Sequence, residues 1–493
     1  MPISMIEKAT QWILANTVPD KGIIVHSRQR VPYPEVSGYY IPTLLSIGRT
    51  DLAKQYARWL TKIQHADGSF GGPTGTGCYA FDTGQIIRGW VSILDQMPDL
   101  LPHLRGACDW LIRSADPATG RLLVPPPGTD WSLGARGEVN EAIHLYALAP
   151  LQSVARKIAD RTYAKFVDKS LGYYLNRTDV TDFTRRNHLS HFFAYIQDAL
   201  LDLGRIDLAK KGMASVAAHQ RPNGAVPGYS DVSWVCSTGL AQLAIVWYRI
   251  GETARAEAAM GFLAKLQNPS GGFMGSYGIG ADYFPAAEIA WAVKYCIDAT
   301  HLQIARHFDD TVGEYSNSID PSDGRVRAVL THLGTLKGKR LLDAGCGKGR
   351  YAALLKRTYP ECATTAMDIS QKMLGCVPAG IERVQSSLLN IPMPDSSYDA
   401  VICIEALEHA VEIPKAVSEL SRVLAPGGKL VIIDKNKDRL GQLAMPSWEK
   451  WFGKTELADL LRSEGLKVSS EFIAYDRHAE PDGLFICWTG TKP

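Results

Sequence analysis

Two patterns of apolar residues divide the chain. Up to about residue 300, apolar side chains recur at i, i+3, i+4 and i+7, as in the run from Ile86 to Leu94, which is the period of a helix with one buried face. From about residue 326, short apolar runs alternate with such helical stretches, which is typical of a parallel sheet with crossover helices. The pattern predicts an all-α domain over residues 1–300, a linker or cap over 301–325 and an α/β domain over 326–493.

The first domain repeats along its length. A glycine turn follows a helical stretch at intervals of about 50 residues, which indicates a repeat architecture. The turns are Asp67-Gly68, Thr119-Gly120, Leu171-Gly172, Asn223-Gly224 and Ser270-Gly271. Each repeat holds two helices, and the resulting helical hairpins can close into a ring with one helix of each pair inside. The expected helices cover residues 4–16, 38–47, 51–65, 81–95, 100–114, 138–148, 151–167, 189–203, 207–220, 235–250, 254–267 and 284–300.

Two of these turns resemble a known repeat. The segments Gln64–Gly72 and Gln267–Phe273 are similar to the Q…G-G-F repeats of the α/α-toroid superfamily. That superfamily includes terpenoid cyclases and protein prenyltransferase β subunits, with similar toroids in polysaccharide lyases, glycosidases and uronyl epimerases. The resemblance covers about residues 1–300 and implies an (α/α)6 toroid without fixing its reaction. The chain lacks the acidic D-x-D-D run of squalene-type cyclases, and Cys236 alone makes no zinc set, so neither cyclisation nor zinc-dependent prenyl transfer is expected.

One face of such a toroid is the expected substrate site. The glycine turns and the N-termini of the inner helices share that face, where aromatic rings can stack on sugars and helix N-termini favour a uronate or phosphate. Asp82 is equally suited to cap a helix and Arg185 to lie in a solvated loop, and His188 and His191 are three residues apart and could share a helix face. The residues expected to bind substrate are Asp82, Trp131, Glu138, Arg185, His188, His191, Trp234 and Tyr283.

The α/β domain opens with the most informative segment of the chain. Its first strand, at about 339–343, runs into a turn that contains Gly345, Gly347 and Gly349, and then into a helix. Glycines let backbone N–H groups approach a ligand that a Cβ would block. The turn resembles motif I of the class I S-adenosylmethionine (SAM) methyltransferases. The resemblance implies that Asp343, at the end of the strand, lies near the methionine part of SAM.

Further motifs follow in the order of that family. Asp368 and Ile369 end the second strand and match motif II, whose acid accepts both ribose hydroxyl protons. The segment 386–399 resembles the L-P-F-P-D-x-S-F-D signature of the ubiquinone/menaquinone-type methyltransferases. That resemblance implies that Ser387 meets the adenine amino group, where many relatives have aspartate, and that Leu388 packs against the adenine.

The residues expected to act on the acceptor come after the fourth strand. The segment 405–410 looks like the A-L-E-H segment at the substrate mouth of the family. His409 has a suitable intrinsic pKa to take a proton from an acceptor hydroxyl, and Glu405 is the second candidate as well as a cofactor contact. A capping or packing role is the alternative for His409.

The last motifs shape the sheet. Residues 423–434 match the L-x-P-G-G-x-L entry to the fifth strand, in which proline and glycine stop a helix and turn the chain into the sheet. Antiparallel strands at 466–475 and 484–489 are expected to complete a mixed seven-stranded, Rossmann-like sheet. Trp448 and Trp451 either cover the acceptor or pack in the core.

The composition limits the class of protein and its expected location in the cell. Of the 493 residues, 46% are hydrophobic and 21% charged, as in globular proteins, and the formal net charge of +2 gives no basic surface for nucleic acid. No apolar run reaches the roughly 18 residues that span a bilayer. The nine cysteines form no C-x-x-C pair and the N-terminus has no secretory pattern. We therefore expect a cytoplasmic protein with reduced thiols and no metal site.

Together these features predict a SAM-dependent methyltransferase whose toroid recognises or separately processes a small-molecule or glycan acceptor. The first expectation is an acidic or lipid-linked saccharide of polysaccharide or natural-product biosynthesis. One alternative is an isoprenoid or terpenoid acceptor in an apolar cavity. A second is a toroid that is itself a lyase, hydrolase or epimerase and uses His188, His191 or Glu138. A third is a toroid scaffold with a protein acceptor.

Overall fold

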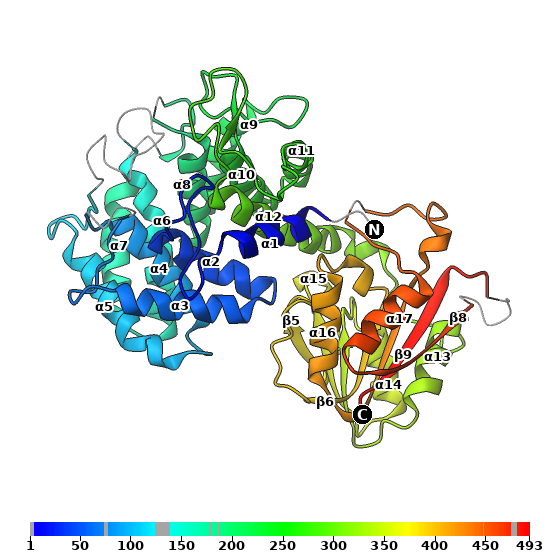
Figure 1. Cartoon of the computed structure of the whole chain (residues 1–493). Helices are drawn as coiled ribbons and strands as arrows, with labels where there is room; N and C mark the ends of the chain where they lie inside the picture. Colours follow the sequence, from blue (N-terminus) through cyan, green and yellow to red (C-terminus); the bar gives the residue numbers. More distant parts are fainter. Residues whose placement is uncertain are drawn as a thin grey trace. The chain divides into compact units, whose positions relative to one another are not determined.

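The computed structural model describes residues 4–493 apart from 73–76, 124–138, 177–179, 186, 447 and 475–480. The chain divides into two compact units. The first contains Met1–Leu45 and Arg49–Gln303, and the second contains Ser46–Gly48 and Ile304–Pro493. In Figure 1 the helices of the first unit run from blue to green, and the sheet of the second unit lies among the yellow to red segments.

The first unit is built from helices. The described residues of the chain form twelve α-helices up to Thr311, which is the number predicted from the sequence. A short antiparallel pair, β1 (Val235–Cys236) and β2 (Ser276–Tyr277), lies among them. The helices are α1 (Met5–Asn16), α2 (Pro34–Ser46), α3 (Thr50–Ile63), α4 (Ala80–Ile93), α5 (Leu101–Arg113), α6 (Leu145–Lys157), α7 (Arg161–Leu175), α8 (Ser190–Asp202), α9 (Ile206–Ala217), α10 (Ser237–Ile250), α11 (Thr253–Ala264) and α12 (Ala290–Thr311).

The glutamine and glycine of the repeat each have a structural task. Nε2 of Gln64 donates to a backbone carbonyl of α5 at 2.9 Å, and Nε2 of Gln267 donates to the carbonyl of Met5 in α1 at 2.8 Å. A Cβ on Gly271 would lie 1.9 Å from the carbonyl oxygen of Lys8, so this turn accepts only glycine. The last repeat of the unit therefore docks onto its first helix.

The helix boundaries predicted at 138–148 and 151–167 are wrong. The two helices there are α6 and α7, which lie later in the chain than expected. Between them Ala159 has φ of +54°, and the Asp160 side chain caps α7 by accepting from the N–H of Thr162 at 2.9 Å. The apolar period continues across this break, so periodicity alone placed a single helix over it.

Gly172 is not a turn residue, which corrects one of the five predicted repeats. It lies within α7, whereas Gly68, Gly120, Gly224 and Gly271 have left-handed φ values between +75° and +93°. Glycine in a helix costs about 1 kcal/mol relative to alanine. The buried face of α7 continues past this position, so packing outweighs that cost.

The even-numbered helices pack on one another around an aromatic centre. α4, α6, α8 and α10 contact one another in that order. The hydroxyl of Tyr40 in α2 donates to the carbonyl of Ala290 in α12 at 2.6 Å, and Thr43 Oγ1 donates to Asp298 Oδ1 at 2.8 Å. These helices bury the rings of Tyr39, Tyr146, Tyr195 and Tyr295.

The second unit contains one mixed sheet of seven strands, as predicted. Its order is β5-β4-β3-β6-β7-β9-β8; the first five are parallel, and β9 is antiparallel to both β7 and β8. The strands are β3 (Arg340–Ala344), β4 (Ala363–Asp368), β5 (Glu382–Gln385), β6 (Tyr398–Ile404), β7 (Leu424–Lys435), β8 (Lys467–Ile473) and β9 (Phe485–Thr491). The helices are α13 (Gly324–Leu333), α14 (Arg350–Thr358), α15 (Gln371–Gly375), α16 (Ile413–Val423) and α17 (Lys454–Ser463).

The strand order creates a switch point at β3. This first strand pairs with β4 on one side and β6 on the other, so the connections leave it in opposite directions. Open α/β sheets bind ligands outside the carboxyl ends of the strands at such a point. The glycine loop follows β3 at this place.

Candidate cofactor site and a second pocket

The loop after β3 is shaped for the close approach of a ligand. Gly345, Gly347 and Gly349 have φ values of +76°, +51° and +71°. A Cβ on Gly345 would lie 2.3 Å from the Cβ of Ala406, whereas a Cβ on Gly347 would meet no atom within 4 Å. Packing therefore fixes Gly345, and the space beside Gly347 can admit a cofactor.

Asp368 connects the end of β4 to the glycine loop. Its Oδ2 accepts from the backbone N–H of Gly347 at 2.8 Å, and its Oδ1 accepts from the N–H of Ser370 at 2.8 Å. Burial raises the pKa of Asp368, and these backbone donors oppose the rise. Each oxygen keeps another lone pair, so the carboxylate can also accept two ribose hydroxyls.

Asp343 ties β3 to the helix after the glycine loop. Its buried Oδ2 accepts from the N–H of Ala352 in α14 at 3.0 Å. Burial raises the pKa of Asp343 to about 7; the hydrogen bond from Ala352 opposes this, and the charge of Asp368 adds to it. The structure thus gives Asp343 a positioning role for the loop and α14.

Ile369, Ser387 and Leu388 lie at the same sheet edge as Asp368. All three are half-buried and follow the carboxyl ends of the paired strands β4 and β5. The N–H of Ser386 donates to the carbonyl of Asp368 at 3.1 Å, which holds the second segment against the first. The three residues that the sequence assigned to the cofactor therefore lie together at this edge of the sheet.

Glu405 follows β6 in a left-handed conformation, with φ of +50°. Its carboxylate forms an ion pair with the buried guanidinium of Arg325, which also contacts Asp323 at 2.8 Å. The ion pair occupies the carboxylate of Glu405 and holds the start of α13 beside the end of β6.

His409 is a buried, neutral base candidate. Burial, together with the charges of Lys435 and His307, lowers its pKa to about 3. Its Nδ1 has no hydrogen-bond partner within the described residues, and its ring packs on Phe308 with centroids 4.9 Å apart. At pH 7 the imidazole can accept a proton, but it lies in a site that disfavours the charged form.

Two glutamates surround the histidine. His409 Nε2 lies 3.5 Å from Glu408 Oε1, and its Nδ1 lies 3.9 Å from Glu449 Oε2. Lys435 Nζ contacts both glutamates, at 2.5 and 3.1 Å, and Trp451 Nε1 donates to Glu449 at 2.6 Å. The side chains of Glu408, His409 and Glu449 are close enough to share a cation. The ammonium of Lys435 already balances the charge of the two glutamates. Trp451 is a core residue here, 2% exposed.

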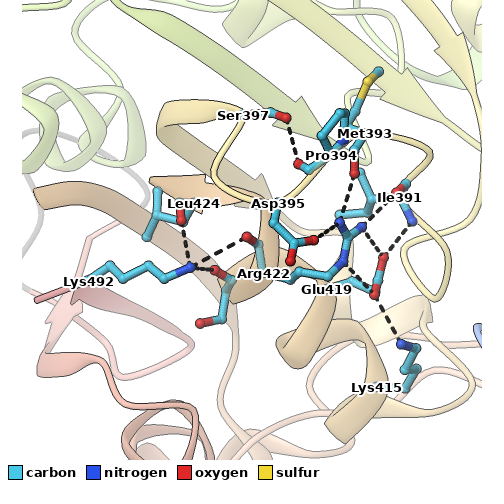
Figure 2. A network of polar contacts seen from close by, with 11 residues as sticks. Ile391, Met393, Pro394, Asp395, Ser397, Lys415, Glu419, Arg422, Leu424 and Lys492 are labelled. Atoms are coloured by element: carbon cyan, nitrogen blue, oxygen red, sulfur yellow. Dashed lines mark hydrogen bonds and ion pairs between the residues drawn. The ribbon is translucent and has the colours of Figure 1, made fainter. Parts of the chain in front are cut away.

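The signature segment around Pro394 is held by one arginine. Figure 2 shows Arg422 of α16 donating to the carbonyls of Ile391 and Met393 and to Asp395, each at 2.8 Å. Arg422 also forms an ion pair with buried Glu419 at 2.7 Å. Part of the segment that resembles the methyltransferase signature therefore serves to anchor this loop on α16.

The predicted cap segment contributes residues to this unit that the sequence analysis did not single out. Asp309, near the end of α12, accepts from Ser370 Oγ at 2.6 Å and from the N–H of Lys372 at 3.1 Å. Lys348 in the glycine loop donates to the carbonyl of Tyr315 at 2.6 Å. The helix predicted at 284–300 continues to Thr311, which is why Asp309 was expected in a linker.

The first unit has a pocket of its own, lined by residues at several helix starts. Glu35, Asp82, His191 and Trp291 lie in the first turns of α2, α4, α8 and α12 and line it together with Tyr283. Asp82, His191 and Tyr283 were expected at a substrate site, whereas Glu35 and Trp291 were missed. Pro34 at the start of α2 was the available signal, because proline favours the first turn of a helix.

Three of the other expected substrate residues, Arg185, His188 and Trp234, are not in the described lining of this pocket. His188 contacts Asn140 and the carbonyl of Asp182, and Trp234 is buried against Tyr229 with ring centroids 5.8 Å apart. These local contacts explain why both side chains turn into the protein. Arg185 is half exposed and forms an ion pair with Asp182 at 3.4 Å. Trp131 and Glu138 lie outside the described residues.

Comparisons with known proteins match the second unit. Residues 342–432 match the family model described as a methyltransferase domain. A fatty-acid O-methyltransferase from Mycolicibacterium smegmatis is 31% identical over 23% of this chain and 42% of its own length, and a demethylmenaquinone methyltransferase from Tropheryma whipplei is 34% identical over 23% and 48%. A solved SAM-dependent methyltransferase from Aquifex aeolicus is 20% identical, with a TM-score of 0.31, over 39% of this chain and 98% of that one.

The match is confined to part of each protein. The chain spans between 42% and 58% of the length of the first three curated relatives that it matches. Within the described residues no helix combines the length and apolarity that a membrane crossing requires. The glycine loop and Asp368, which are joined by a hydrogen bond, both lie within the matched residues 342–432. The chain therefore contains a methyltransferase domain, and the cofactor of that domain is SAM.

Proposed function

We propose that this chain transfers a methyl group from SAM to a small-molecule acceptor. The observation that carries the proposal is the hydrogen bond from Gly347 N–H to Asp368, beside a loop with open space, at the switch point of the sheet. A ribose-bearing cofactor fits such a site. The matched methyltransferase domain supports the same chemistry.

The second unit supplies groups that suit each part of the cofactor. When bound, SAM supplies a methyl group on a sulfonium, which moves in line to a nucleophile. Asp368 would accept the ribose hydroxyls, and Ser387 and Leu388 would contact the adenine. Ser387 offers a hydrogen bond there without the charge of an aspartate, so it would bind the adenine less strongly than an aspartate would. Asp343 would keep α14 and the glycine loop in place.

His409 would take the proton of a hydroxyl acceptor. The neutral ring has an unpartnered Nδ1, and the nearby carboxylates of Glu408 and Glu449 would stabilise the imidazolium that forms. The buried site and Lys435 oppose that charge. Because these effects oppose each other, His409 would hold the proton only briefly and pass it on to solvent.

The helices of the first unit would close into an (α/α)6 toroid. Two hydrogen bonds support closure, one from Gln267 to Met5 and one from Tyr40 to Ala290. Each joins a segment near the C-terminal end of the unit to a helix near its N-terminal end. We assign this toroid, over about residues 1–300, to substrate handling, residues 301–325 to a cap and residues 326–493 to methyl transfer.

The pocket of the first unit favours some acceptors over others. Its converging polar groups support a small-molecule ligand over a filled protein scaffold or a purely apolar isoprenoid channel. Two buried carboxylates repel anions, so they do not favour the acidic or phosphate-bearing saccharide that the sequence suggested. A glycan without acidic groups, or a separate reaction in the toroid, remains compatible with the pocket.

Transfer of a labelled methyl group tests the proposal. The full chain is incubated with methyl-labelled SAM and an extract of the cells that express it, and the small molecules are then separated from the proteins. We expect label in the small molecules with the unmodified chain and with Asp399→Ala, a variant at the opposite end of β6, and none with Asp368→Ala. Label in proteins would favour a protein acceptor, and no label in either fraction would contradict the proposal.

A further inference from the structure

A histidine, a glutamate and a cysteine meet at one edge of the sheet in the second unit. A ring nitrogen of His332, a carboxylate oxygen of Glu471 and the sulfur of Cys487 all lie within 4.8 Å of one another. The three side chains come from three elements, α13, β8 and β9. Their positions in the chain follow no short ligand spacing such as C-x-x-C, so no metal site was expected from the sequence.

The strand pairing places two of these side chains on one face of the sheet. Glu471 of β8 lies directly opposite Cys487 of β9 in the antiparallel register. Side chains opposite each other in such a pair share a face, with Cβ atoms about 4.5–5.5 Å apart. The next pair on this face, Ser469 and Thr489, is joined by a hydrogen bond of 2.7 Å between the two hydroxyl oxygens. The backbone therefore holds the glutamate and the cysteine side by side.

The helix α13 brings the histidine to the same face. It packs on both β8 and β9, and His332 lies in its last turn (Figure 1). His332 Nε2 contacts Glu471 Oε1 at 2.7 Å, and these two side chains are 27% and 56% exposed. Cys487, in contrast, is fully buried. The group is thus open to solvent on the side of the glutamate and closed by the protein on the side of the cysteine.

The charges around this group leave room for a cation. The described ion pairs of Glu471 include no lysine or arginine, whereas Glu408 at the other candidate cation site is paired with Lys435. The ammonium of Lys429 lies near the end of α13, where it donates to the carbonyl of His332 at 2.8 Å. A metal ion held by the three side chains would therefore displace no ammonium from the carboxylate.

We propose that His332, Glu471 and Cys487 bind a zinc ion, with water as the fourth ligand. Imidazole nitrogen, thiolate sulfur and carboxylate oxygen are the donors that zinc takes in proteins, and a soft thiolate disfavours Mg²⁺ and Ca²⁺. The ligand atoms of a tetrahedral zinc ion lie about 3–4 Å from one another, so shifts of about 1 Å would bring these atoms into place. On binding, Cys487 loses its thiol proton to solvent and coordinates as the thiolate.

The role of such an ion would be structural. β8 is the last strand of the sheet order and is paired only with β9 within the described residues. Zinc would join this edge strand to its neighbour and to α13, so that part of its binding energy would stabilise the fold of the second unit. Arg325, which pairs with Glu405 after β6, lies at the start of α13, whereas His332 lies at its other end. The proposal is independent of methyl transfer.

Cobalt, as a spectroscopic substitute for zinc, tests the proposal on the full chain. The chain is treated with a chelator, kept reduced with a phosphine, and titrated with Co²⁺ and then with Zn²⁺. We expect one Co²⁺ per chain with the absorption band of a thiolate bound to cobalt, and displacement of the cobalt by zinc. Zinc should also raise the urea midpoint of the second unit. Absence of the thiolate band, or of any zinc binding, would overturn the proposal.

Matched variants locate the ion. Cys487→Ala should abolish the thiolate band, and His332→Ala should weaken zinc binding by at least about tenfold. Cys376→Ala is the control, because that cysteine is exposed in the same unit and lies outside the group. A band that persists in Cys487→Ala, or one that disappears in Cys376→Ala, would contradict the assignment. If Cys487→Ala does not fold, His332→Ala still decides, because its side chain is partly exposed and its loss leaves the core intact.

Discussion

Asp368 and Gly347 are joined by a hydrogen bond of 2.8 Å, from the backbone N–H of the glycine to Oδ2 of the carboxylate. The bond connects two segments that the sequence singled out separately, the glycine loop after β3 and the acid that ends β4. It fixes the loop in the left-handed conformation that keeps the space beside Gly347 open. The proposed cofactor site is therefore formed by main chain as much as by side chains.

The glycines of the loop should differ in what they tolerate. Gly345→Ala should lower the stability of the second unit by about 1–3 kcal/mol, because its Cβ would overlap that of Ala406 and φ is left-handed. Gly347→Ala meets no atom and should cost about 1 kcal/mol, while its methyl group enters the space proposed for SAM. Urea unfolding and SAM titration separate these effects. Equal stability losses in the two variants would argue against this division of roles.

Arg422→Ala should destabilise the second unit by about 2–4 kcal/mol, because it leaves Glu419 buried with Lys415 as its remaining cation and frees the loop at Ile391. The measurement is the midpoint and slope of urea unfolding. Asp395→Ala is the matched control. It removes an arginine partner that is 77% exposed, so it should change stability by less than about 0.5 kcal/mol. A control as damaging as Arg422→Ala would mean that the exposed pair holds the loop.

The fold should lose stability in mild acid through buried histidines. Burial lowers the pKa of His144 to about 4, so between pH 6.5 and 4 the unfolded chain binds a proton that the folded chain does not. The free energy of unfolding should therefore fall as pH falls through this range. At pH 5, His144→Gln should remove about 1–2 kcal/mol of the loss that occurs between pH 7 and pH 5. Unfolding curves with the same pH dependence in both proteins would contradict this.

Gln267→Ala should destabilise the first unit by about 1–2 kcal/mol, because it breaks the bond that docks the last repeat onto the Met5 carbonyl of α1. Thermal unfolding measures the effect. Gln96→Ala, at an exposed position after α4, is the control and should have little effect. If both variants unfold at the temperature of the unmodified chain, the glutamine of the repeat does not contribute to closure.

The two units differ in how much of them could be predicted. The sheet followed from short apolar runs that end at Asp343, Asp368 and Ile404, since strand ends next to turn residues are strong local signals. Helix boundaries in the first unit were less certain, because the apolar period continues through the break at Ala159 and through Gly172.

The pockets could be predicted only in part. Asp82 was recognised because it begins an evident helix, whereas Glu35 was placed outside a helix that was expected to begin at residue 38. Asp309 was missed because α12 continues beyond its predicted end. The ion pair between Arg325 and Glu405 joins residues 80 positions apart, and a distance of that kind carries no periodic signal in the sequence.

Calorimetric titration of the full chain with SAM tests the central claim most directly. We expect one site per chain, and Asp368→Ala should weaken SAM binding by about 1–3 kcal/mol, since it removes the buried carboxylate that is proposed to accept the ribose hydroxyls. Asp399→Ala should bind SAM as the unmodified chain does, because that carboxylate pairs with Arg340 at the amino end of the strands. Absence of binding in the unmodified chain, or unchanged affinity in Asp368→Ala, would contradict the account.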